Sequence, residues 1–289
     1  MFYRNCFLFF IVIVLSASCR NVRIKEHKNW EKYFDAYAVS GSFEIYDNNK
    51  EIAHYYNKEL NAKPISPSST FDIFVALTAL ETVTAKDEQK ILEWDGVERE
   101  NEKMNKNLSL SEAFEINSTS HIRKLIQEIG EEDIDKYLFT LQYGNQERKG
   151  DMENFWMNGN LKISPDEQVG LMKRLYHTEL PQFNERSHRI VRGMLFKEEG
   201  DTYRLYYKMG IDTTVSPNRS ILVGMVEQTI SRKHVKTKQM ENIPHPHFFA
   251  LTAQGESLTP ASYEEITLNL LWDLLDANNI GDKANFYKK

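Results

Sequence analysis

The sequence is poor in cysteine, in glycine and in excess positive charge, and each shortage excludes a class of protein. Two cysteines, Cys6 and Cys19, are too few for a disulfide scaffold, and a chain of 289 residues can bury a core without one. Lys and Arg number 36 against 42 Asp and Glu, so the net charge of −6 provides no basic face for nucleic acid. The 13 glycines are scattered and form no phosphate-binding loop. With 41% apolar residues the chain is nevertheless too apolar to be disordered, which leaves a globular protein.

The N-terminus has the pattern of an export signal. Arg4 precedes ten apolar residues, 6–15, which span about 15 Å of helix and are too few to cross a bilayer. Small residues follow and lead to Cys19. This arrangement resembles the lipobox of bacterial lipoproteins, although Ser16 stands where that pattern usually has Leu, and ordinary signal cleavage is the alternative. We therefore expect a signal peptide over 1–18 and an exported protein anchored through a lipid on Cys19, in the bacterial cell envelope and facing the periplasm.

The remainder of the chain shows no linker, internal repeat or low-complexity run. Residues 19–28 are polar and predict a short tether, 29–280 predict one domain, and 281–289 a C-terminal tail. Alternating residues predict a hairpin over 41–56, Ser164-Pro165 predicts a helix start, and two late apolar runs predict buried strands. Strands near both ends and helices between them favour an α+β fold. The segments are a largely apolar helix from Ser69, helical patterns in 110–130 and 132–142, strands in 220–227 and 248–253, and a final helix from Ser262.

Several short segments together resemble the class D (oxacillinase-type) serine β-lactamases, within the wider penicillin-binding transpeptidase-like family. Their order and spacing cover nearly the whole domain. The resemblance implies an antiparallel sheet of about five strands flanked by helices, with an inserted all-helical lobe, and no cofactor. The segments are Phe43-Glu44-Ile45-Tyr46-Asp47, Ser66-Pro67-Ser68-Ser69-Thr70-Phe71, Glu93-Trp94-Asp95-Gly96, Tyr143-Gly144-Asn145, Asn154-Phe155-Trp156, Glu167-Gln168-Val169 and Lys208-Met209-Gly210.

The resemblance makes Ser69 the counterpart of the family's nucleophile, which stands at a helix start in a Ser-x-x-Lys motif. A hydroxyl needs a neighbouring base to attack a lactam carbonyl at neutral pH. In class D enzymes the Lys carries CO2 as a carbamate, which a Trp matching Trp156 holds by a hydrogen bond. Here Asp72 replaces that Lys. Its carboxyl carbon falls short of the carbamate position by roughly 5 Å, and its ordinary pKa of about 4 makes it a weak base.

Two interpretations of Ser69 and Asp72 follow. In the first, the two residues form a variant of the helix capping box, with the acid reaching back to the chain before the helix. In the second, they form a working Ser–Asp dyad. An ion pair between Asp72 and Lys208 is a further expectation, and a distance well beyond about 4 Å between their charged atoms would exclude it.

Other positions also depart from the family's motifs. Asn117 aligns with a Ser that passes a proton to the leaving nitrogen, and an amide cannot relay a proton as a hydroxyl does. The Lys-Thr-Gly strand becomes Lys208-Met209-Gly210, in which Met209 lacks the hydroxyl that fixes the ligand. An Arg is absent near the last helix, where Tyr263 is the nearest match. Because these changes fall on chemical positions while the scaffold motifs persist, they predict loss of catalysis on a retained fold.

Two further signals are discounted. His245-Pro246-His247 could bind a metal from one face of a strand, but the intervening Pro suggests a loop and no acidic residue is near in sequence, so no metal site is expected. The basic stretch 231–238 is expected to be a solvated hairpin tip.

These observations leave three functional hypotheses. The first is an envelope lipoprotein of class D β-lactamase-like fold, a pseudoenzyme that recognises β-lactams or peptidoglycan-stem ligands. The second is an active serine β-lactamase that works through a Ser69 acyl-enzyme. The third is a non-catalytic structural or sensor protein of the envelope, in which Asp72 and Met209 pack or pair with their neighbours and fill the pocket.

Overall fold

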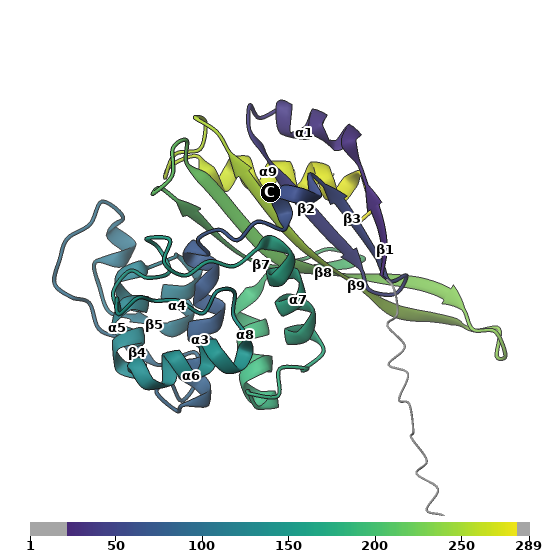
Figure 1. Cartoon of the computed structure of the whole chain (residues 1–289). Helices are drawn as coiled ribbons and strands as arrows, with labels where there is room; N and C mark the ends of the chain where they lie inside the picture. Colours follow the sequence, from purple (N-terminus) through teal and green to yellow (C-terminus); the bar gives the residue numbers. More distant parts are fainter. Residues whose placement is uncertain (1–21, 282–289) are drawn as a thin grey trace, which may run out of the picture.

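A large central sheet carries the fold in the computed structural model, which describes residues 22–281 (Figure 1). The spatial order of its seven strands is β1-β3-β2-β9-β8-β7-β6. Neighbouring strands are antiparallel except β1 and β3, which are parallel. The sheet is therefore larger than the expected five strands and mixed at one edge. The strands are β1 (Arg23–Glu26), β2 (Ser40–Asp47), β3 (Ile52–Tyr56), β6 (Phe196–Glu199), β7 (Tyr203–Asp212), β8 (Arg219–Lys233) and β9 (Met240–Gln254).

Helices cover both faces of the sheet. The helices α1 (Glu31–Asp35) and α9 (Tyr263–Asp276) lie on one face, and α7 (Pro165–Tyr176) and α8 (Glu185–Leu195) lie on the other, beside a helical lobe (Figure 1). The lobe is the expected inserted part, and it is helical apart from one short strand pair. It contains α3 (Asp72–Glu81), α4 (Leu110–Glu115), α5 (Thr119–Ile129) and α6 (Glu131–Leu141), with a small ladder of β4 (Ile91–Leu92) and β5 (Leu108–Ser109). Short helices complete the chain: η1 (Lys28–Trp30), α2 (Lys58–Asn61), η2 (Ser68–Phe71) and η3 (Glu102–Met104).

Local chemistry explains where several helices begin. Ser164 accepts a hydrogen bond from the Glu167 N–H at 3.2 Å, and the Glu167 carboxylate accepts one from the Ser164 N–H at 2.8 Å. This reciprocal capping box starts α7 as the sequence predicted. The helical pattern over 110–130 is instead divided between α4 and α5, because Asn117 has a left-handed backbone with φ of 55°.

Two hydrophobic clusters lie on opposite faces of the sheet. One joins the helical lobe, α7 and α8 to the sheet, and includes Phe71, Phe74 and Trp156. The other lies under α9 and α1, and includes Phe43 and Trp272. Alternate residues of β8 and β9 contribute to each cluster, as the twofold period of a strand dictates.

The ends of the domain differ in part from the expected boundaries. Residues 23–26, within the expected tether 19–28, form β1 at the sheet edge, so ordered structure begins before residue 29. The expected signal peptide 1–18, Cys19 and all but the first residue of the tail 281–289 lie outside the described residues. In the described part of the chain, no helix has the length and apolar character needed to span a bilayer.

Candidate functional site

The candidate site forms where η2 meets the C-terminal part of β7. Ser69 lies in η2 with 7% of its surface exposed. Ser68 has a left-handed φ of 48°, and its hydroxyl donates a hydrogen bond to the Ile211 carbonyl at 2.7 Å. This bond ties η2 to β7 and fixes the backbone on which Ser69 stands.

Gly210 allows this close approach. A Cβ at position 210 would lie 2.7 Å from the Ser69 backbone nitrogen and 3.0 Å from the Ser69 Cβ. Such distances are too short for any side chain, so only glycine fits between β7 and η2. The structure therefore brings Gly210 and Ser69 together.

The capping-box interpretation of Ser69 and Asp72 is wrong. The N-cap of η2 is Pro67 and that of α3 is Phe71, and neither cap makes a side-chain hydrogen bond within the part of the chain that the structure describes. The chain passes from η2 into α3 without a break, which places Ser69 inside the helical turn. The Asp72 carboxylate therefore interacts with a group outside this turn.

The group that pairs with the Asp72 carboxylate is Lys208. The Lys208 Nζ lies 2.9 Å from Asp72 Oδ2, and the two side chains are 3% and 4% exposed. The expected ion pair is therefore confirmed. The ammonium also donates to the side-chain oxygen of Asn117 at 2.7 Å and to the backbone carbonyl of Phe114. Its position 4.1 Å from the centroid of the Phe114 ring adds a cation–π contact.

The pair is electrostatically isolated from solvent. Burial raises the pKa of Asp72 and the attraction of Lys208 opposes that rise. Burial likewise lowers the pKa of Lys208, and Asp72 opposes that change. Each charge therefore depends on the other, and three acceptors take up the three N–H bonds of the ammonium.

Asn117 and Tyr263 extend the site toward α9. The Asn117 amide donates to the Tyr263 hydroxyl oxygen at 3.2 Å, while its own oxygen accepts from Lys208. Tyr263, the nearest sequence match to the family's missing Arg, thus reaches the site. The neighbouring Ser118 points elsewhere and lies in hydrogen-bond contact with His121 at 2.7 Å.

Met209 does not belong to the site, contrary to the motif comparison. Lys208 and Gly210 face η2 and α3, but Met209 points to the opposite face of the sheet and packs in the cluster under α9. The alternation of a strand explains this, because adjacent residues project from opposite faces. The third hypothesis did expect Met209 to pack against neighbours, and it does.

Trp156 and Tyr143 line the buried side of the α3 start. Trp156 is 1% exposed, its ring stacks on Phe71 at 5.9 Å between centroids, and its carbonyl accepts from the Ser66 hydroxyl at 2.8 Å.

The hydroxyl of Tyr143 is buried without a hydrogen-bond partner among the described residues. The charge on Asp72 adds to the effect of burial in raising the pKa of Tyr143. Sequence reasoning gave no role to Phe114 or to this hydroxyl, although Tyr143 stood in one of the recognised segments.

The expectation that His245-Pro246-His247 forms a loop is wrong. All three residues lie inside β9, and Asp47 of β2, distant in sequence, is paired with His247 in the sheet. Asp47, His245 and His247 are buried, and their side chains are close enough to one another to hold a metal ion. This cluster belongs to the α9 face of the sheet, away from Ser69.

Comparisons with known proteins agree with this architecture. Residues 36–239 match the family model of the penicillin binding protein transpeptidase domain. The chain is 30% identical over 203 residues to Beta-lactamase OXA-48 of Klebsiella pneumoniae, an alignment that covers 70% of this chain and 76% of that protein.

Solved structures show the same similarity. The C-terminal domain of the Bacillus licheniformis BlaR penicillin-receptor is 25% identical, with a TM-score of 0.79 over 90% of this chain and 98% of that chain. A class D β-lactamase from Sebaldella termitidis is 28% identical, with a TM-score of 0.79 over 91% of this chain and 100% of that chain. A class D β-lactamase and a penicillin-receptor domain therefore share this fold.

Proposed function

Because the chain belongs to the penicillin-binding transpeptidase family, with class D β-lactamases among its relatives, we propose that it is a penicillin-recognising protein of the cell envelope with an impaired serine site. Its ligands are β-lactams or the peptidoglycan-stem peptides that they resemble. Relatives whose names describe β-lactamases and a penicillin receptor support this ligand class.

The observation that carries the impairment is the contact of 2.9 Å between Asp72 and Lys208. Attack by Ser69 requires a group that accepts the hydroxyl proton. A carboxylate held by an ammonium is a weaker base than a free one, and an ammonium with three N–H donors in use has no lone pair to offer. The low exposure of Ser69 further limits access to a ligand carbonyl.

A direct test mixes the wild-type protein with a chromogenic cephalosporin and follows both colour and intact mass. We expect no turnover above the uncatalysed rate and no covalent adduct on Ser69. Equilibrium binding of the same compound, measured by calorimetry, should nevertheless be detectable. Turnover at the rate of ordinary β-lactamases, lost in Ser69→Ala with folding intact, would establish the alternative of an active serine hydrolase.

A restoration experiment separates lost chemistry from a lost groove. The double variant Asp72→Lys with Asn117→Ser returns an amine and a hydroxyl to their family positions, and bicarbonate supplies CO2 for a carbamate. We expect acylation to appear in this variant only. The matched control Asp72→Asn with Asn117→Ser also breaks the ion pair but has no amine. Adding Met209→Thr should give no further gain, because that side chain faces α9.

A second candidate function is signalling. The similarity to a penicillin-receptor domain, over 98% of that domain, favours a sensor that binds its ligand without turnover. This function predicts that a bound β-lactam persists without hydrolysis and changes the exposure of Ser69 or its neighbours. Hydrogen exchange of η2 and β7 with and without ligand measures that change.

We further propose export and attachment to the envelope through a lipid on Cys19. The support is the order of Arg4, an apolar run, small residues and a cysteine. Metabolic labelling with a palmitate analogue tests it. Wild type should be labelled and Cys19→Ser should not, whereas label in both variants, or in neither, would contradict the anchor.

A further inference from the structure

A second cluster of chemically active side chains lies on the α9 face of the sheet, at the end of β2. Asp47 is the last residue of β2, and sheet pairing sets it beside His247 of β9. His245, two residues earlier, projects from the same face. One carboxylate oxygen and one ring nitrogen from each His all lie within 4.8 Å of one another, and all three residues are buried.

Within this cluster the Asp47 carboxylate contacts both histidine rings and one ammonium. His245 Nε2 lies 2.6 Å from Asp47 Oδ1, and His247 Nε2 lies 3.6 Å from Asp47 Oδ2. The ammonium of Lys50 lies 2.9 Å from Oδ2, on a side chain that is 63% exposed and free to turn into solvent. Nδ1 of His247 is buried and has no hydrogen-bond partner in the described part of the chain, which is uncommon for a buried polar atom.

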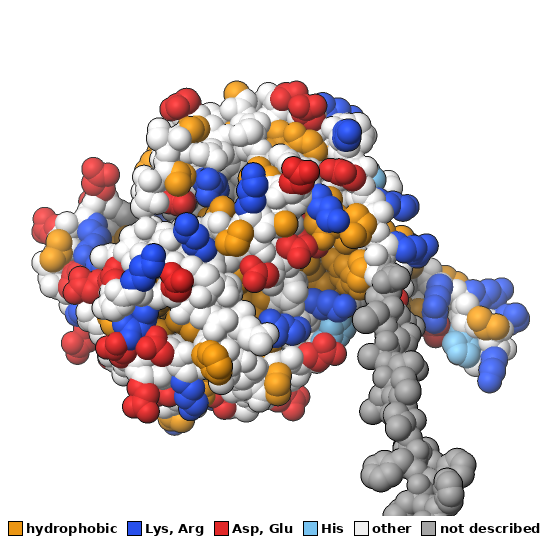
Figure 2. All heavy atoms as spheres, viewed as in Figure 1, with side chains coloured by type: hydrophobic (Ala, Val, Ile, Leu, Met, Phe, Trp, Pro, Cys, Tyr) orange, Lys and Arg blue, Asp and Glu red, His pale blue; other side chains and the backbone are white. Residues whose placement is uncertain are grey.

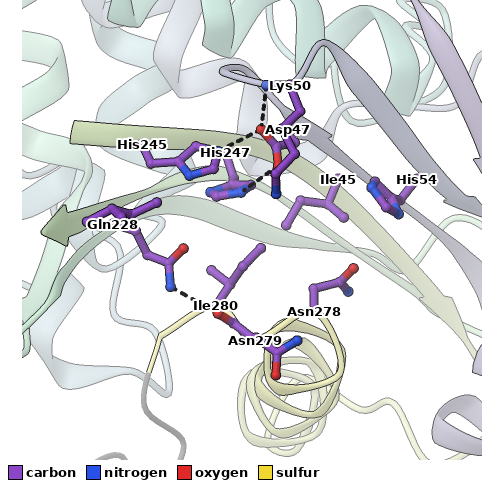
Figure 3. A pocket seen from close by; sticks show the side chains of 11 residues that line it. Ile45, Asp47, Lys50, His54, Gln228, His245, His247, Asn278, Asn279 and Ile280 are labelled. Atoms are coloured by element: carbon purple, nitrogen blue, oxygen red, sulfur yellow. Dashed lines mark hydrogen bonds and ion pairs between the residues drawn. The ribbon is translucent and has the colours of Figure 1, made fainter. Parts of the chain in front are cut away.

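A cavity of about 360 Å³ adjoins the cluster (Figure 3). The Asp47, His245 and His247 side chains converge at its sheet side, while Asn278 and Asn279 approach from the end of α9. A water molecule takes about 30 Å³ of liquid volume, so the cavity can supply water to complete a coordination shell.

We propose that Asp47, His245 and His247 bind one divalent cation of the zinc type. Two imidazoles and one carboxylate are the donor set that suits Zn²⁺, Ni²⁺ or Cu²⁺ and not Mg²⁺ or Ca²⁺, which take oxygen ligands. The three protein ligands fill three tetrahedral positions, and water from the cavity fills the fourth. Ligand atoms around Zn²⁺ lie roughly 3.3 Å apart, so side-chain shifts of about 1–2 Å give this spacing by bringing the more distant atoms together and separating the 2.6 Å pair of His245 and Asp47. The cation displaces the ammonium of Lys50 from Asp47 and replaces the hydrogen bond between His245 and Asp47; a proton on the ring nitrogen that binds the cation moves to the other ring nitrogen or to water.

This inference is independent of the serine site, because the cluster lies on the opposite face of the sheet. The test titrates Zn²⁺ into full-length protein freed of metal with a chelator, using calorimetry and, with Co²⁺, visible absorption. We expect one Zn²⁺ per chain and a Co²⁺ spectrum of tetrahedral coordination. His247→Ala should weaken binding at least about 100-fold, since the loss of an outer-shell partner alone costs 10–100-fold.

Two variants that leave every buried side chain intact make the test decisive. Lys50→Gln removes the competing ammonium and should tighten Zn²⁺ binding, whereas a purely structural Asp47–His pair predicts no Zn²⁺ binding in either protein. His234→Ala, at the hairpin tip, should leave the affinity unchanged. The proposal is overturned if wild type binds no Zn²⁺ at millimolar concentration, if His234→Ala abolishes binding, or if His247→Ala folds and binds as wild type does.

Discussion

At the residue scale, the opposite charges of Asp72 and Lys208 stabilise each other in the core, where either charge alone would be unfavourable. Removing one partner leaves the other charged and buried, which typically costs about 3–5 kcal/mol. We therefore expect Asp72→Ala to lower the free energy of unfolding by that amount, and Asp72→Leu with Lys208→Met to lower it less than the single change does. Urea unfolding measures both. The exposed pair Arg232–Glu241 serves as the control, and its loss should cost less than about 1 kcal/mol.

The raised pKa of the buried carboxyl of Glu44 should make the free energy of unfolding decrease as pH rises. Burial, followed by the charge of Asp166, raises the pKa of Glu44 from its ordinary value of 4.5 to about 8. Hydrogen bonds from Asn61 at 2.7 Å and Tyr55 at 3.0 Å oppose but do not cancel that rise. Between these two pKa values the folded protein holds a proton that the unfolded chain has lost, so stability falls as pH rises.

The corresponding experiment compares wild type with Glu44→Gln. The contribution of Glu44 is complete below pH 4.5 and is lost by about pH 8, with a slope of up to about 1.4 kcal/mol per pH unit. Glu44→Gln, which is neutral at every pH, should flatten the curve of unfolding free energy against pH over this window. Equal slopes in the two proteins would show that Glu44 is ionised in the folded state.

At the element scale, the close packing of β7 on η2 is the feature that positions Ser69. Gly210→Ala would force a Cβ to within 2.7 Å of the Ser69 backbone, so we expect a loss of about 1–3 kcal/mol from overpacking. Gly170 is exposed in α7, and no atom of residues 22–281 would lie within 4 Å of a Cβ added there. Gly170→Ala should therefore stabilise the protein by up to about 1 kcal/mol, and thermal unfolding of the two variants should shift in opposite directions.

Elements with local signals could be predicted from the sequence, and elements that depend on distant partners could not. The capping residues of α7 and the turn residues after β2 act on positions a few residues away, so the helix start and the turn could both be predicted. The strand β9 begins at Met240, well before the expected strand over 248–253. Its polar first half pairs with β8 and extends as a hairpin (Figure 1). That hairpin ends in the predicted basic tip, whose Lys and Arg side chains stand out from the body (Figure 2).

The same distinction holds for the site. Matching motifs located Ser69, Asp72 and Lys208, and the opposite charges of Asp72 and Lys208 suggested an ion pair between them. The face on which Met209 lies depends on strand register, and the meeting of Asp47 with His247 depends on sheet order, so neither was visible in a linear sequence.

At the scale of the whole molecule, the central sheet contributes residues from one face to one hydrophobic cluster and from the other face to the second cluster. Val223 and Phe248 face the cluster of the helical lobe, while Leu222 and Phe249 face the cluster under α9. Neither cluster can lose its packing without freeing strands that the other cluster needs. Although chains of this length often unfold through intermediates, this shared sheet should make both layers unfold together.

The four tryptophans allow a test of this cooperativity without disturbing the core. Trp156 reports the cluster of the helical lobe and Trp272 reports the cluster under α9. Protein labelled with 5-fluorotryptophan should lose both native fluorine resonances at the same urea concentration, with assignments made from single Trp→Phe variants. If the Trp272 signal disappears while that of Trp156 persists, the α9 layer unfolds independently, because the strands then retain their lobe-side packing after the other face has been exposed.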